Sequence, residues 1–486
     1  MNILIVGNGF DLSHYLPTKY DHFMDVMKAI EKKDLSKPWN TVLTSPFEHP
    51  VHCLTKLREI GKAIDDKSYQ MNFDELFGKC RENWFVSKTK EIYQTEDVLI
   101  TESQIIKTQS LLKQNNWYQY FKKHVREVKT WIDFETKIEE VLKVIAIFVL
   151  RLETTISEYG LSSKEIILDS SEKSPIGQIL LTREYCNVLE VFKVLKSGYY
   201  TYREFQGGER GPYYQEVEVE YDEEDDQNFK FNIEDDYALY QNGSYKVKVD
   251  KIISSLHQQL EDFIEIFNLY LELIVDKLEP KAQIKIEAES WSLPDHIYSF
   301  NYTNTFRKFY QRDIKAEFLH GRFGEEQNIV LGISDLEDKS LKKLKAYGFT
   351  KYHQKLFKNT DYVFLDTFKE KIKDLTEKHE KHKNTNYANF QVEQQRGNDI
   401  FELSRLNLNI FIWGHSLDLS DKDYINDLFC LNDDIDRNVI VTVYYFDKPA
   451  KFTLLNNLLA ILDKEKVEKW MKKGWLIFEK NPEIKF

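Results

Sequence analysis

The chain has 486 residues, of which 42% are hydrophobic and 30% are charged. That size and composition allow a large buried core, in two or three domains or in one α/β domain that carries an insertion. The formal net charge of -13 repels nucleic acid on average, so we place nucleic acid last among the partners to consider.

Compartment and metal content follow from what the sequence lacks. No apolar run approaches the roughly 18–20 residues that a membrane-spanning helix needs, and the N-terminus has no basic leader. The four cysteines are far apart, without the paired spacing of a zinc ribbon or a disulfide framework. We therefore expect a cytoplasmic protein with no membrane partner and no bound metal.

The first thirty residues predict a strand, a tight loop and a helix. Asn2–Val6 is an apolar run that ends in Gly7-Asn8-Gly9, which is typical of a buried strand entering a loop. Thr18, with Asp21 three residues later, is the expected N-cap of the following helix. Glycines in such a loop let backbone N–H groups approach a phosphate at the positive end of a helix. A tight turn without a ligand would use the same glycines.

The middle of the chain has a different character. From about residue 54 to 161 the pattern is mainly helical, and a long helix is expected over Ile252–Leu278. Between them, residues 198–236 contain several glycines and the acidic run Glu216–Asp226, which indicates an exposed excursion that could form a β-hairpin. We expect residues 51–285 to form a mainly helical region with this excursion. Its aromatic anchors would be Trp84, Trp117, Tyr120 and Trp131.

The C-terminal part alternates short apolar runs with helical stretches. The expected strands are Ile297–Phe300, Ile329–Leu331, Leu408–Trp413, Val439–Phe446 and Leu476–Phe478. This alternation predicts an α/β fold with a mainly parallel sheet covered on both faces. Because sites in such sheets form at the carboxyl ends of strands, the polar residues that follow these runs are the candidates.

Three of these candidates lie between Phe300 and Ile329. Asn301 could hold a ribose hydroxyl or a carboxamide, whereas Asn304 better suits a helix cap. His320, which precedes a glycine, could act as a base because imidazole titrates near neutrality, although a lone histidine is more often structural. Arg322 could reach a phosphate or a carboxylate.

Two further segments allow more than one interpretation. Gly414-His415-Ser416 ends the strand at Trp413 and, with Asp418 and Asp421, could cradle a ligand or cap a helix. Residues 339–358 hold seven lysines and no acid. We interpret them as a solvated face, with a loop that closes over an anionic ligand as the alternative.

Several blocks, in order, resemble the AbiH family of abortive-infection proteins. Gly7–Leu12 with Leu16-Pro17-Thr18 is similar to its opening signature. The later blocks are Trp131–Glu135, Ser299–Thr303, Leu319–Gly321 and Trp413–Leu417. The resemblance spans nearly the whole chain and implies defence against phage, with a phage-derived trigger.

A more distant resemblance is to sirtuin-like domains, which carry a Gly-x-Gly loop with a downstream proline, an asparagine after a strand, a His-Gly pair and a late Gly-x-Ser-Leu. The matching positions here are Gly7, Gly9 and Pro17, then Asn301, His320-Gly321, and Gly414–Leu417. The resemblance implies a Rossmann-like, sirtuin-like nucleotide-binding domain formed by residues 1–50 and 286–486. It implies that Asn301 orients the nicotinamide ribose or the attacking water and that His320 is the base.

The same resemblance implies NAD or a related nucleotide as substrate or ligand. The residues that would hold it are Gly7, Asn8, Gly9, Phe10, Asp11, Thr18, Arg322, Gly414, His415 and Ser416. Asn8 and Asp11 depart from the usual Gly-Ala-Gly loop and would place an amide and a carboxylate beside the phosphates. That departure could alter the ligand, or leave binding without cleavage.

Three functions therefore stay open. The first is an effector that hydrolyses NAD or a related nucleotide when phage infects. The second is a nucleotide-sensing module, without turnover, that controls a protein partner or a homo-oligomer. The third, a toxin that acts on nucleic acid through the lysine-rich segment, is disfavoured by the charge of -13.

Overall fold

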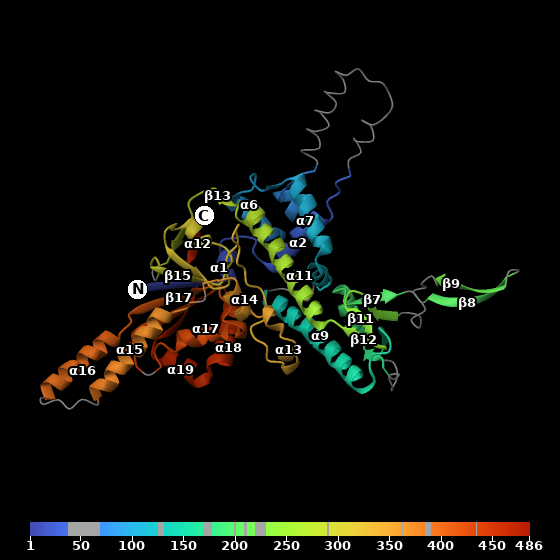
Figure 1. Ribbon diagram of the computed structural model, residues 1–486. Coiled ribbons are helices and arrows are strands. Elements are labelled where there is room, and N and C mark those ends of the chain that lie inside the picture. The colour runs from blue at the N-terminus through green and yellow to red at the C-terminus, as the bar shows by residue number, and fades with distance from the viewer. Residues whose placement is uncertain are drawn as a thin grey trace, which may run out of the picture. The chain divides into compact units, whose positions relative to one another are not determined.

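A computed structural model describes most of the chain (Figure 1). The described residues are all except 37–68, 125–130, 169–176, 199–200, 209–210, 219–229, 289–290, 362, 384–389 and 434. Among them, no helix combines the length and the apolar character needed to cross a membrane.

The chain divides into two compact units. Unit 1 comprises Met1–Thr108, Phe267–Ser334 and Lys351–Phe486, and unit 2 comprises Gln109–Ile266 and Asp335–Thr350. These bounds differ from the expected helical region 51–285, because residues 69–108 and 267–285 belong to unit 1 and a short later segment belongs to unit 2.

Unit 1 is built on a six-stranded parallel sheet, so the chain is an α/β protein. The strands, in their order across the sheet, are β16 (Lys315–Phe318), β15 (His296–Ser299), β1 (Asn2–Val6), β17 (Leu408–Trp413), β18 (Val439–Tyr445) and β19 (Leu476–Lys480). Numbered along the chain, their spatial order is third, second, first, fourth, fifth and sixth. Every neighbouring pair is parallel, which brings all six carboxyl ends to one edge.

The apolar runs located most of this sheet. The expected strands at Asn2–Val6 and Leu408–Trp413 are confirmed end to end, and those that became β15, β18 and β19 are confirmed within two residues. The expected strand Ile329–Leu331 is wrong, because this buried segment is irregular. The side chain of Gln354 takes the place of a neighbouring strand there, accepting from Leu331 N and donating to Leu331 O, both at 3.0 Å.

Alternate residues of the four inner strands enter two separate cores, one on each face of the sheet. Ile3 and Ile5 of β1 pack in the core formed with helices α17 (Lys422–Phe429), α18 (Lys448–Leu462) and α19 (Lys464–Lys472). Leu4 and Val6 pack on the other face, against Phe10 of α1 (Asn8–Ser13) and Phe306 of α12 (Thr305–Phe309). Both faces are therefore covered, as expected for a parallel sheet.

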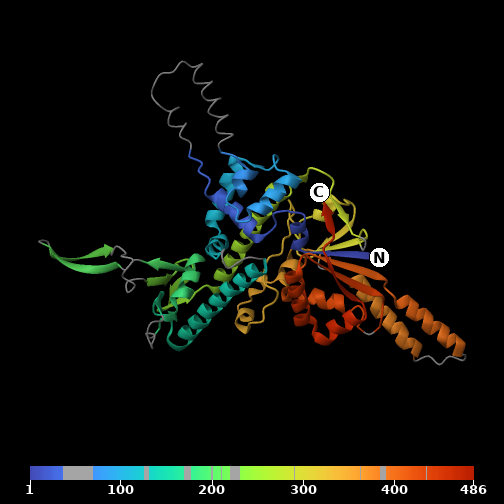
Figure 2. The ribbon, with the colours of Figure 1, turned by 180° about the vertical axis from the view of Figure 1, so that it is seen from behind.

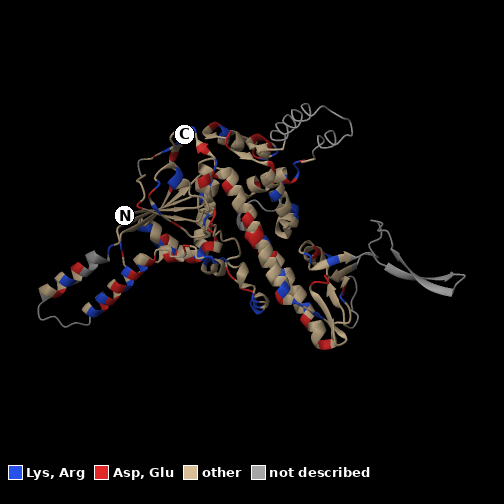
Figure 3. Cartoon of the chain, turned by 45° about the horizontal axis from the view of Figure 1, so that its top comes forward, with Lys and Arg blue, Asp and Glu red and all other residues tan. Residues whose placement is uncertain are grey.

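The remaining helices of unit 1 are of two kinds. α2 (Tyr20–Glu31), α5 (Phe73–Phe77), α6 (Asn83–Ile92) and α14 (Lys351–Phe357) follow or support the loops at the carboxyl edge. α15 (Asp366–Lys383) and α16 (Phe390–Ser404) lie side by side, as the orange pair in Figure 2. Charges of both signs run along α15 (Figure 3).

Unit 2 is mainly helical. α8 (Asn116–Lys123), α9 (Trp131–Tyr159) and α10 (Arg183–Val191) lie within it, α7 (Glu102–Gln114) enters it and α11 (Val249–Tyr270) leaves it. It also holds α13 (Lys339–Lys343) and a small sheet of β6 (Ile179–Leu181), β5 (Glu165–Leu168), β10 (Lys230–Ile233) and β7 (Leu195–Gly198).

The excursion expected near residues 198–236 contains an antiparallel pair, β8 (Thr201–Gly208) with β9 (Gly211–Glu218). Most of the acidic run, residues 219–226, lies outside the described residues. Of the expected aromatic anchors, Trp117 and Tyr120 are buried in unit 2. Trp84 of unit 1 is 62% exposed, so its assignment as an anchor is wrong.

Candidate functional site

The opening glycines are explained by close packing of the β1–α1 loop on the end of β17. Gly7 N donates to Trp413 O (3.1 Å) and Gly9 N donates to Gly414 O (2.8 Å). A Cβ atom added to Gly9 would lie 2.7 Å from Gly414 Cα, which no real side chain tolerates. These two N–H groups are thus engaged within the protein, and phosphate binding by this loop stays a prediction.

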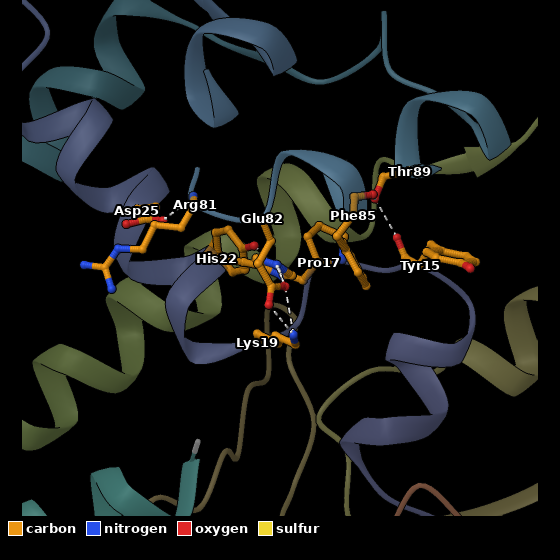
Figure 4. A network of polar contacts seen from close by, with 10 residues as sticks. Tyr15, Pro17, Lys19, His22, Asp25, Arg81, Glu82, Phe85 and Thr89 are labelled. Carbon is orange, nitrogen blue, oxygen red and sulfur yellow. Dashed lines mark hydrogen bonds and ion pairs between the residues drawn. The ribbon is translucent and has the colours of Figure 1, made fainter. Parts of the chain in front are cut away.

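The loop that follows α1 is held by α6 rather than capped by Thr18. Helix α2 begins at Tyr20 with Lys19 at its N-cap, so the expected cap at Thr18 is wrong. Thr89 Oγ1 donates to Tyr15 O (2.8 Å), as Figure 4 shows. The same view shows Lys19 Nζ donating to both carboxylate oxygens of Glu82, each at 2.8 Å. These contacts fix the backbone between α1 and α2.

Asp11 is buried at the carboxyl end of β15. Thr303 Oγ1 donates to its Oδ2 (2.6 Å) and Thr305 Oγ1 donates to its Oδ1 (2.7 Å). Burial raises the pKa of Asp11 from 3.8 to about 6, against the hydrogen bonds from Thr303, Thr305 and Asn301, which lower it. Asp11 therefore faces the polar loop after β15, where its carboxyl group titrates near neutral pH.

Asn301 lies beside this carboxyl group. Its side chain helps to lower the pKa of Asp11, and the residue is only 5% exposed. Its amide oxygen Oδ1 is buried and has no hydrogen-bond partner among the described residues. Asn304 occupies the N-cap position of α12 as expected, but its side chain makes no capping hydrogen bond.

Two adjoining spaces open at this point. Asp11 and Asn301 line a narrow cavity of about 10 Å³. A pocket of about 300 Å³ lies next to it and is lined by Tyr302, Phe323, Arg322 and acidic residues of the same loop. Residues Asn304, Arg307 and Phe318 line both spaces, so the narrow cavity adjoins the pocket that Arg322 lines.

A second polar cluster lies at the ends of β16 and β17, centred on Asp421. His320 Nε2 is 3.2 Å from Asp421 Oδ1, and His415 Nε2 is 3.4 Å from Asp421 Oδ2. Leu417 N donates to His415 Nδ1 (2.9 Å), so the ring proton of neutral His415 sits on Nε2 and points at Asp421. Asp421 ends the short helical turn Leu419–Asp421 and makes no side-chain cap with α17, so its carboxylate is left for the two histidines and Lys351.

Burial and charge set the protonation states in this cluster. Burial lowers the pKa of His320 to about 3, although the Asp421 carboxylate opposes the shift. Burial alone would raise the pKa of Asp421, but Lys351 and the histidines outweigh it and hold that pKa well below 3.8. At neutral pH the cluster therefore pairs an ionised carboxylate with a neutral His320, which is the form able to accept a proton.

The low pKa of His320 predicts a loss of stability in acid. The unfolded imidazole binds a proton near pH 6.5 and the folded one only near 3, so its contribution is present above 6.5 and is lost as the pH falls towards 3. By about pH 5 the expected cost is about 2 kcal/mol. Because Asp11 contributes with the opposite sign, the measurement is the difference in unfolding free energy between His320→Asn and wild type. An unchanged difference from about pH 7 to about pH 5 would contradict the shift.

The lysine-rich segment contributes directly to this cluster. Lys351 and Lys355 of α14 are buried, at 4% and 7% exposure, so the interpretation of 339–358 as a solvated face is wrong for them. Lys351 Nζ lies 3.5 Å from Asp421 Oδ1, and Lys355 Nζ donates to the hydroxyl of Tyr424 (2.5 Å). α14 buries its polar residues 351, 354 and 355 and exposes Tyr352 and Phe357, the reverse of an ordinary amphipathic helix.

The expected site residues thus fall into separate groups. Asn301 and Asp11 meet after β15, and His320 and His415 meet through Asp421. No hydrogen bond or ion pair joins Asn301 to His320 among the described residues, and His320 lines neither space. Phe10 is a core residue against Trp413, with ring centroids 5.1 Å apart.

The remaining predicted site residues, Ser416 and Asn8, lie outside both groups. Ser416 is exposed and its carbonyl accepts from Asn457 Nδ2 (2.9 Å), while Asn8 is the first residue of α1. Lys351, Thr303 and Thr305 were not assigned from the sequence to the groups that they join, and Asp421 was grouped with His415 but not with His320.

Comparison with known proteins identifies the family. The family model described as bacteriophage abortive infection AbiH matches residues 3–445. No curated protein and no solved structure matched the chain in the same comparisons. The match extends over most of both units and includes the ends of β1, β15, β16 and β17. The chain therefore belongs to the AbiH family, whose role is abortive-infection defence against bacteriophage.

Proposed function

We propose that this chain is an abortive-infection effector that binds a nucleotide at the carboxyl edge of its sheet and hydrolyses the glycosidic bond, with NAD as the expected substrate. The observation that carries the proposal is the pocket of about 300 Å³ beside Arg322, which adjoins the cavity of Asn301 at the ends of β15 and β16. Small-molecule sites are typically about 300–1,000 Å³ and combine apolar walls with a few polar groups.

The sheet topology supports a nucleotide as the ligand. The strand order 3-2-1-4-5-6 is that of doubly wound, Rossmann-like sheets, which bind dinucleotides outside the carboxyl ends of their strands. β15 and β16 end in register at Ser299 and Phe318, so Asn301 and His320 each stand two residues beyond the last pair. A ligand along this edge would lie close to both loops.

The lining residues suggest how such a ligand would be held. Arg322 is exposed at the pocket and suits a phosphate, while Tyr302 and Phe323 offer rings to a base or a ribose. Asn301 would orient the ribose or the attacking water, as the sirtuin-like resemblance implies. His320, kept neutral and oriented by Asp421, would serve as a second proton acceptor, towards a ribose hydroxyl.

Turnover of NAD by the purified full chain tests this proposal. Nicotinamide release is measured with and without lysate of phage-infected cells. We expect release by the wild type, and a reduction of about 10²-fold or more for Asn301→Ala and for His320→Asn. His353→Ala, an exposed position on α14, is the control and should retain full turnover.

The outcomes separate hydrolysis from binding. No release in either condition, with His320→Asn still protecting cells, would overturn the proposal. Thermal stabilisation by NAD without release would instead support a nucleotide sensor, and the position of His320 outside both spaces favours that candidate.

A further inference from the structure

The cavity lined by Asp11 and Asn301 has the size of a site for one water molecule, with a carboxyl group and an amide set among mainly apolar walls. Its volume of about 10 Å³ is close to the smallest space that holds a water. Asn301 Oδ1 is a buried acceptor without a partner among the described residues, and residue 301 lines this cavity. A buried amide oxygen with no hydrogen bond costs about 1–3 kcal/mol, which a water would recover.

We propose that Asp11 is the general base that takes a proton from a water held in this cavity by Asn301. The inference rests on the proposed nucleotide hydrolysis and assigns the group that activates the attacking water. Asp11 then acts as a catalytic residue rather than as a ligand of the phosphates.

The hydrogen bonds around Asp11 leave room for this water. An ionised carboxylate has about four lone-pair positions. The hydroxyls of Thr303 and Thr305 occupy one on each oxygen. A further position remains on each oxygen, so a water can donate one hydrogen to Asp11 and the other to Asn301 Oδ1. Its oxygen lone pair is then available for attack.

The position of the cavity suits a hydrolytic water. It shares Asn304, Arg307 and Phe318 with the larger pocket, so a water within it would lie next to a ligand bound there. The buried face of the cavity is formed by the side chains of α1 and the β15 loop, which hold Asp11 in place before a ligand binds.

The proposed step balances as a hydrolysis. The water oxygen forms a bond to C1′ of the ribose while one of its protons passes to the Asp11 carboxylate. The bond between C1′ and the base nitrogen breaks, and its electron pair stays on the base, which leaves as neutral nicotinamide. The proton on Asp11 is later released to solvent, so the reaction consumes water and needs no other reactant.

The charges around Asp11 are consistent with this role. Burial raises the pKa of Asp11 to about 6, so the carboxyl group is mainly ionised at pH 7 yet basic enough to accept a proton. Arg307 is the other charged residue among the described residues that line the cavity. Burial, with smaller contributions from Tyr310 and Asp11, raises the pKa of Tyr93 well above 10, so Tyr93 stays neutral. Acid–base behaviour near pH 6 is therefore assigned to Asp11 itself.

A purely structural role for Asp11 is the alternative, since the carboxylate ties α1 to the loop after β15. Two variants separate the two roles. Asp11→Asn removes the base and keeps the shape of the side chain. Thr305→Val removes one hydrogen bond that lowers the pKa of Asp11 and leaves the carboxyl group in place.

The test measures nicotinamide release against pH for the full-length wild type and both variants, with NAD binding followed by calorimetry. We expect wild-type kcat to rise with pH through about 6, because only the ionised carboxylate accepts the proton. Asp11→Asn should lose about 10²- to 10⁴-fold in kcat while its Kd for NAD changes less than about threefold. Thr305→Val should stay active, and its kcat should rise at a higher pH than that of the wild type.

Three results would overturn the assignment. The first is a kcat of Asp11→Asn equal to that of the wild type. The second is a Thr305→Val variant whose kcat rises at the same pH as in the wild type. The third is a parallel loss of binding and turnover in both variants. If the wild type releases no nicotinamide, the proposed function fails and this inference with it. If the wild type turns over and Asp11→Asn does too, only the role of Asp11 is lost.

Discussion

Asp421→Asn is expected to lower the free energy of unfolding by about 3–5 kcal/mol at neutral pH, because it removes one member of a buried ionic cluster. The carboxylate lies 3.5 Å from Lys351 Nζ and 3.2 Å from His320 Nε2. Asparagine has the same shape, but it offers one acceptor oxygen and no charge to these groups. Denaturant unfolding measures the loss.

The neighbouring aspartate supplies a matched control. Asp418 accepts a hydrogen bond from Ser420 N at the start of the same short helical turn but takes no part in the buried cluster. Because asparagine caps a helix about as well as aspartate, Asp418→Asn should change the free energy of unfolding by less than about 0.5 kcal/mol. If both variants lost the same small amount, the cluster around Asp421 would contribute nothing beyond a cap.

Strands buried on both faces were the most predictable part of the fold. β1 and β17 lie at the centre of the sheet, and an apolar run is what two covered faces require. β16 is an edge strand of sequence Lys-Ala-Glu-Phe, with neighbours on one side only, so no apolar run marks it. Ile329–Leu331 carries such a run, yet its backbone bonds to a side chain. An apolar run indicates that a segment is buried, but it does not indicate which groups form hydrogen bonds with the backbone of that segment.

The site could be predicted only in pieces. Asn301 and His320 stood out because polar residues at strand ends are informative in a parallel sheet. Their partners did not, since Lys351 and Asp421 reach His320 from distant segments, and a lysine on a charged run is ordinarily solvated. The one local signal was the spacing 351, 354 and 355, which gives α14 a polar face opposite its exposed aromatic residues. A helix of that pattern buries its polar face against other polar groups.

The sequence was also insufficient to show why glycines are needed in the Gly-Asn-Gly motif. Gly-Asn-Gly after a strand was interpreted as a phosphate loop, and its residues do stand at the carboxyl edge. In the described contacts, glycine is required because the loop packs closely on the end of β17, and no ligand is involved. The motif and the segment at Gly414 therefore form one packed unit, although about 400 residues separate them in the chain. The best test of that unit lies at Gly414.

Gly414→Ala is expected to lower the free energy of unfolding by about 2–5 kcal/mol, through overpacking together with a left-handed backbone. Gly414 has φ +72°, and an added Cβ would lie 2.0 Å from Phe10 N, a backbone atom that cannot move aside without displacing α1. Gly474→Ala separates the two causes, because Gly474 has φ +70° but nothing within 4 Å of the added Cβ. That control should lose only about 1–2 kcal/mol of unfolding free energy, the backbone cost alone.

Because α1 carries Asp11, the displacement in Gly414→Ala should also reduce nicotinamide release, whereas Gly474→Ala should not. Equal losses of stability in the two variants would show that the β1–α1 loop adapts to the methyl group, and that close packing does not explain the glycines.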